Sequence, residues 1–180
     1  MNSAKQEVKF ATIFATIQSI YKYHATSTIR WNKLKERAMP KGLPKRESDI
    51  RCNARYDAVN CVHGNLDELF SHFEEIIDER DLNPDTRSEA QIILNSMLRF
   101  DFVCLLEYWV SVLRPIDRIQ KRLQDPKIDF KNAAGDIEGL KIHFQSEKDT
   151  ICSKAIEQAK EKCQSWGIAI GIDHRIRKKK

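Results

Sequence analysis

The sequence predicts an all-α protein, a bundle of five or six helices, from three observations. Apolar residues recur at helical spacing through most of the chain. Only six glycines and five prolines interrupt the 180 residues. No segment alternates apolar and polar residues long enough to form a sheet, and IAIGI at 168–172 is the sole strand candidate. With 41% hydrophobic and 32% charged residues, the composition is typical of a folded domain.

The first half of the chain contains signals for two helices and a loop. A first helix is expected over about residues 4–24, where Ser3 and Gln6 resemble a capping box. A second, shorter helix (IRWNKLKERA) follows Thr26 or Ser27, either of which can cap it. The segment MPKGLPKRESD, with two prolines and a glycine, then predicts a loop.

Three longer helices are expected after the loop. One runs from about 52 to 80, and Gly64 weakens it mildly. Asn83 and Pro84 begin the next, which extends to about 124 and which Pro115 should kink or break. Asp129 can cap the last, over 130–165. We therefore expect a helical domain over 1–167 and a basic tail over 168–180.

The apolar window FDFVCLLEYWVSVL, at 100–113, is too short to span a bilayer and contains Asp101 and Glu107. It predicts a buried helix. The N-terminus, MNSAKQEVKF, lacks the apolar stretch of a signal peptide. We expect no membrane partner. We expect a soluble protein of the nucleus or the cytoplasm.

Positive charge is concentrated in two places. Residues 30–55 contain nine Lys or Arg against three acids, and the last six residues, RIRKKK, add five more. Two such clusters fit contact with a polyanion such as nucleic acid. The alternative is a solvated loop and a solvated tail.

Arg51 and Arg55 are one helical turn apart at the start of a predicted helix. Cations there oppose the helix dipole, so the pair indicates a docked phosphate or carboxylate. Alternatively, both arginines pair with Asp49, Asp57 or acids of a neighbouring helix. The candidate nucleic-acid-binding residues are Arg51, Arg55, Arg30, Lys33, Lys45 and Arg46.

The sequence contains no motif for metal binding, redox chemistry, nucleotide binding or hydrolysis. The five cysteines form no CxxC pair, which argues against a zinc or redox site and for reduced thiols. The five histidines are scattered, and there is no glycine-rich phosphate loop, GxSxG or HExxH. No catalytic residue, metal or cofactor is predicted.

Several segments resemble, in order, those of hAT-superfamily transposases and their domesticated relatives, such as zinc finger MYM-type protein 1 and the THAP-domain repressors. They are FATIFATIQSIYKYHATSTIRWNKLK, IRCNARYDAV, RFDFVCLLEYWVSVL, IDRIQKRLQDPKIDFKNAAGDIEGLK and the closing HRIRKKK. The series covers essentially the whole chain; no single motif in it is highly specific.

The resemblance implies a helical insertion domain without its enzyme core. In that family a ribonuclease-H-like core is interrupted by such an insertion, and three carboxylates hold two metals at the cut phosphate. By the resemblance, those carboxylates lie before and after this segment. Cys52 also stands where family members carry a tryptophan able to stack on a base.

We therefore expect a catalytically inactive, transposase-derived helical domain that binds the DNA backbone or a protein. DNA contact would involve residues 30–55 and the C-terminal tail. The alternative is a structural or protein-interaction module with no nucleic-acid role. In that case an apolar stripe on helix 4–24 would bind a partner or a second copy, through Phe10, Phe14, Ile17 and Tyr21. An active nuclease is not expected.

Overall fold

The computed structural model describes residues 3–37, 39–44 and 52–170. In these ranges it contains seven helices and no strand: α1 (Ser3–Ala25), α2 (Thr28–Lys35), α3 (Cys52–Gly64), α4 (Leu66–Asp78), α5 (Pro84–Met97), α6 (Phe100–Leu123) and α7 (Phe130–Ser165). The predicted all-α class is confirmed. The predicted number of five or six helices is too low, because two of the expected helices are each divided in two.

The predicted helix over 52–80 is divided by Asn65. This buried residue leaves the helical pattern to hold the loop that precedes α3. Its side-chain amide donates to the Gly42 carbonyl at 2.8 Å, and its Oδ1 accepts from the Lys41 amide at 3.1 Å. A side chain that satisfies two backbone groups of another segment competes with continuous helix.

The predicted helix over 84–124 breaks at Leu98 and Arg99 and not at Pro115, where a kink or a break was expected. Arg99 has an extended backbone, and its guanidinium bonds Asp101 through Nε at 2.8 Å and Nη2 at 2.6 Å. Asp101 Oδ1 also accepts from the Phe102 amide at 3.0 Å, so the start of α6 is satisfied locally. Pro115 lies inside α6, which continues past it.

The predicted caps are confirmed where the structure describes them. Ser27, Asn83 and Asp129 each accept a bond from a backbone amide in the first turn of α2, α5 and α7. Gly167 adopts a φ of 67° just after the end of α7, a conformation that glycine tolerates best. Residues 168–170 form no strand, and the rest of the IAIGI segment lies outside the described ranges.

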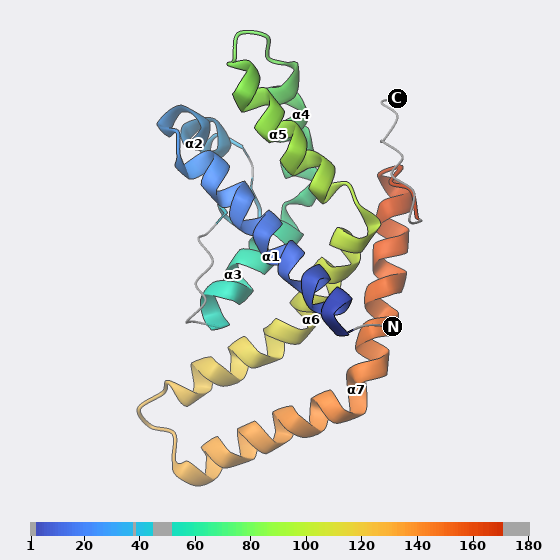
Figure 1. Ribbon diagram of the computed structural model, residues 1–180. Helices are drawn as coiled ribbons and strands as arrows, with labels where there is room; N and C mark the ends of the chain where they lie inside the picture. The colour runs from blue at the N-terminus through green and yellow to red at the C-terminus, as the bar shows by residue number, and fades with distance from the viewer. Residues whose placement is uncertain (1–2, 38, 45–51, 171–180) are drawn as a thin grey trace.

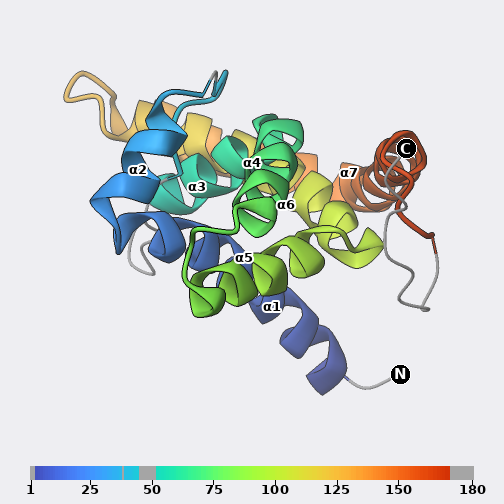
Figure 2. The ribbon, with the colours of Figure 1, turned by 90° about the horizontal axis from the view of Figure 1, so that it is seen from above.

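The helices form a body with one projecting arm (Figure 1). In the body, α6 packs against α3 and α7, α4 against α5, and α1 against α2, α5 and α6. Figure 2 shows α2 and the C-terminal half of α7 on opposite sides of it. Its largest fully buried apolar side chains come from helices α1 to α6: Ile13, Ile17, Ile20, Tyr23, Leu34, Val59, Leu69, Phe70, Phe73, Met97 and Leu106.

The arm, residues 114–145, is a helical hairpin made of the C-terminal part of α6, the loop 124–129 and the N-terminal part of α7. α7 changes direction along its length, so its second half runs beside the body (Figure 1). No residue between 118 and 154 is buried, and Phe130 at the tip is 90% exposed. The arm therefore packs mainly on itself.

The apolar window at 100–113 lies in α6 and faces the core through residues such as Phe102, Val103, Leu106 and Val110. The predicted buried helix is confirmed. None of the helices in the described ranges combines the length and the apolar character needed to cross a membrane.

Candidate functional site

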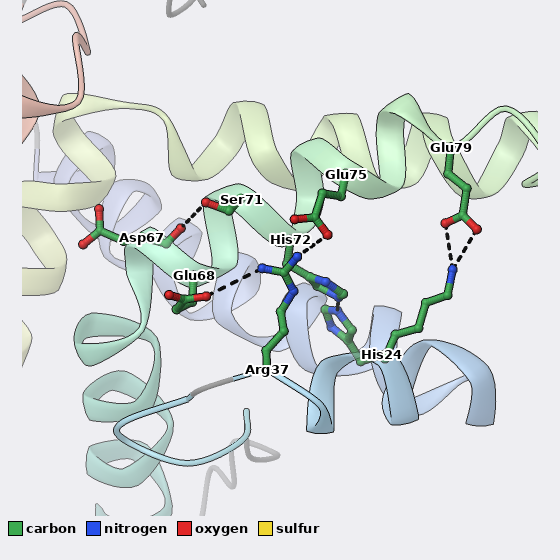
Figure 3. Close-up of polar contacts among 9 residues, drawn as sticks. His24, Arg37, Asp67, Glu68, Ser71, His72, Glu75 and Glu79 are labelled. Carbon is green, nitrogen blue, oxygen red and sulfur yellow. Dashed lines mark hydrogen bonds and ion pairs between the residues drawn. The ribbon is translucent and has the colours of Figure 1, made fainter.

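Lys33 of α2 and Arg37 in the turn after it are bound to acids of α4 and of its C-terminal cap. Lys33 Nζ lies 2.7 Å from Glu79 Oε1, and the Arg37 guanidinium bonds Glu75 and lies 3.6 Å from Glu68 (Figure 3). The hydrogen bond from Arg37 lowers the pKa of Glu75, so this carboxylate stays charged. Lys33, a predicted DNA contact, is thus balanced within the chain.

Arg30 and Arg55 lie against aromatic rings of α1. The Arg30 guanidinium carbon is 4.3 Å from the centre of the Tyr23 ring, and its Nη2 donates to Thr26 Oγ1 at 2.8 Å. Arg55 lies 5.3 Å from the centre of the Phe14 ring. Both arginines are half-buried. The structure therefore places them at two different points along α1 and does not gather them into one cluster.

Three predicted contacts, Lys45, Arg46 and Arg51, lie outside the described ranges, as does the C-terminal tail from residue 171. Of the anion site expected at Arg51 and Arg55, only Arg55 therefore lies within the described ranges.

The predicted apolar stripe of helix 4–24 is already packed within the chain where it is described. Ile17 belongs to the core. The Phe14 ring lies 5.1 Å from that of Trp109, and Tyr21 lies 6.1 Å from Trp31, each pair edge to face. The side chain of Phe10 lies outside the described part.

A pair of buried histidines joins α1 to α4. His24 Nδ1 lies 2.8 Å from the Ile20 carbonyl, and His24 Nε2 lies 3.1 Å from His72 Nε2 (Figure 3). These partners assign the protons: His24 donates from Nδ1 and accepts at Nε2 from the Nε2–H of His72. The His24 ring is therefore neutral.

Burial is the main cause that lowers the pKa of both histidines to about 4. Positive neighbours act in the same direction: Arg30 on His24, and Arg37 and Lys33 on His72. Sequence reasoning missed this pair, because its members are 48 positions apart.

A second internal cluster joins α3, α6 and α7 through the buried carboxylate of Glu107. His63 Nε2 lies 2.9 Å from one Glu107 oxygen and Lys162 Nζ lies 2.5 Å from the other. Burial alone would raise the pKa of Glu107, but these two partners lower it below its ordinary value. The cluster contains the residue types of acid–base chemistry, yet its geometry is that of a satisfied ion pair between helices.

A groove of about 440 Å³ lies between α6 and α7 on the arm. From α6 it is lined by Arg114 and Arg118, and from α7 by His143. Neither arginine makes a hydrogen bond or ion pair within the described ranges, in contrast to Lys33 and Arg37. Two exposed guanidinium groups one turn apart are suited to bind an oxyanion.

Two glycines of α7, Gly135 and Gly139, leave the groove open. An added Cβ at either position meets no atom within 4 Å, so a side chain would extend into free space. Asp136, between them, also lines the groove, and Arg122 Nη2 balances it at 3.1 Å from Oδ1. The i, i+4 spacing of both pairs could have indicated this site from the sequence.

No metal site is found in the part of the chain that the structure describes, where no three His, Cys, Asp or Glu side chains gather. Cys61, Cys104, Cys152 and Cys163 are thiols that form no disulfide, and the side chain of Cys52 lies outside the described part. Burial raises the pKa of Cys163 to about 11, which keeps this thiol protonated.

Comparison with known protein families, with curated proteins and with solved structures found no match to this chain. The resemblance to hAT-superfamily transposases therefore stays a prediction.

Proposed function

We propose that this chain is a non-catalytic helical domain that binds nucleic acid through the phosphate backbone, as a transposase-derived insertion domain would. One observation carries the proposal. The arginines of the arm, Arg114 and Arg118, have no acidic partner in the described ranges and lie together at a groove. Free paired guanidinium groups bind phosphate well.

The internal ion pairs support a role without catalysis. Glu107 and Lys162 hold α6 to α7, and Lys33 and Arg37 hold α2 and its following turn to α4. A group saturated by its own chain in this way is better suited to hold helices together than to transfer protons. Residues 45–51 and the tail would add further backbone contacts.

The test is fluorescence anisotropy of labelled single-stranded and duplex oligonucleotides against the full chain over a series of salt concentrations. Binding by charge neutralisation must weaken linearly in log K against log salt. Absence of binding to both forms at low salt would contradict the proposal. Magnesium-dependent nicking that persists through purification would contradict the non-catalytic part.

The alternative, a protein-interaction module, is favoured by exposed apolar side chains on α7. Phe130 is 90% exposed and Ile137 is 55% exposed, and they lie seven residues apart on one face of the helix. Sedimentation velocity of the wild type and of Phe130→Asp tests it. Phe14→Asp would not, because Phe14 packs against Trp109 and its loss would disturb the fold. Self-association abolished by Phe130→Asp would favour this module.

A further inference from the structure

We infer that the groove between α6 and α7 binds one unpaired nucleotide. Its phosphate would contact Arg114 and Arg118, and its base would lie on the apolar floor of the groove, which Pro115, Ile119 and Leu140 form. This inference rests on the proposed function and narrows it, because it names single-stranded nucleic acid as the ligand class.

The phosphate end of the groove follows from the two arginines. Residues four apart on a helix have neighbouring Cβ atoms, so both guanidinium groups can reach one phosphate. The nearest carboxylate that lines the groove, Asp136, is balanced by Arg122. The groove therefore keeps a net positive character.

The base end follows from the other lining residues. Pro115, Ile119 and Leu140 present apolar surface, and His143 adds an exposed imidazole. Such a floor contributes nothing to a bare phosphate, but it removes the face of a base from water. The volume of about 440 Å³ lies within the range of small-molecule sites.

The preference for single strands follows from this combination. In a duplex the faces of the bases are stacked within the helix, so only the phosphates could reach the arginines. An unpaired nucleotide can use both ends of the groove.

The experiment compares four full-length proteins by anisotropy with a short fluorescein-labelled oligothymidylate. The first is the wild type. Arg114→Ala/Arg118→Ala removes the phosphate contacts, and Lys127→Ala/Lys131→Ala removes the same charge from the same arm outside the groove. Gly139→Leu fills the groove. Leucine forms helix better than glycine, and the Cβ at this position meets no neighbour, so the variant should fold.

We expect the arginine variant to bind the single strand at least about tenfold more weakly than the wild type. Its salt slope should fall by about 0.7, which corresponds to one single-strand phosphate contact. The lysine variant should change affinity by less than about twofold at physiological salt, where isolated exposed charges are screened. Gly139→Leu should weaken single-strand binding by about tenfold and leave duplex binding unchanged.

Equal losses in the arginine and lysine variants, or no loss in Gly139→Leu, would overturn the inference and leave backbone binding intact. No binding to either nucleic acid by the wild type would overturn the proposed function as well. Competition with dTMP identifies the source of the nucleotide. Displacement of the strand by dTMP at micromolar concentration would identify a free nucleotide and overturn the assignment to a strand, whereas displacement only at millimolar concentration supports a strand. Inorganic phosphate as effective as dTMP would overturn the role of the apolar floor.

Discussion

Acidification from pH 7.5 to pH 5 should destabilise this protein through the buried pair His24 and His72. In the folded state both pKa values are about 4, against 6.5 as the ordinary value. Between these two values the unfolded chain binds protons that the folded chain does not. The stabilisation is therefore complete above about pH 6.5 and is lost as the pH falls towards 4.

The magnitude follows from the same values. At pH 5 an unfolded histidine is almost fully protonated and a folded one with a pKa of about 4 almost fully neutral, which corresponds to roughly 2 kcal/mol for each ring. The pair therefore contributes up to about 4 kcal/mol. This is a large part of the ~5–15 kcal/mol typical of a domain. These pKa values already include the effects of Arg30, Arg37 and Lys33, which lower them, and of Glu75, which opposes the shift in part.

The assay is urea unfolding, followed by circular dichroism, at pH 7.5 and pH 5. His72→Phe should be less stable at pH 7.5 by about 1–3 kcal/mol, because it leaves the buried Nε2 of His24 without a donor. The same variant should lose only about half as much as the wild type on acidification. His143→Asn, which changes an exposed ring, serves as the control and should keep the full loss. Equal acid sensitivity in the wild type and in His72→Phe would refute the reasoning.

Three further predictions concern the ion pairs, the arm and the core. Lys162→Met should lower the free energy of unfolding by about 1–3 kcal/mol in urea titrations, since it removes a partner of the buried Glu107 carboxylate. Lys141→Met breaks only an exposed pair, so a comparable loss there would contradict this account. Gly135→Ala should raise the stability of the arm by up to about 1 kcal/mol, measured as slower amide exchange in the arm, because its Cβ meets no neighbour. Leu106→Ala should cost about 2–5 kcal/mol in the same titrations, since this side chain is fully buried, and a loss below about 1 kcal/mol would place it outside the core.

The all-helical class and most helix ends could be predicted because they depend on local signals. Helical periodicity and the caps at Ser27, Asn83 and Asp129 are read from neighbouring residues. The two unpredicted helix breaks, at Asn65 and at Arg99, depend on side-chain contacts that helical periodicity does not reveal. Asn65 divides a helix because it binds a loop more than twenty positions earlier, and Arg99 begins a new turn through Asp101.

The same distinction explains the outcome for the candidate site. A count of positive charges singled out residues 30–55, but the count cannot show that Lys33 meets Glu79, 46 positions later. The pair Arg114 and Arg118 has the same spacing as Arg51 and Arg55 and was visible in the sequence. What could not be seen was that Asp117, in the same turn, is buried and bonds Lys121, and that α7 presents two glycines opposite the arginines.

The absence of any buried residue between 118 and 154 has a consequence for how this protein can change. Cooperative unfolding of the body does not require the hairpin to open or close, so the hairpin behaves as a separate, weaker unit. Substitutions there carry almost no penalty for the remainder of the molecule. Selection could therefore alter ligand preference in the arm while the helices of the body stay the same.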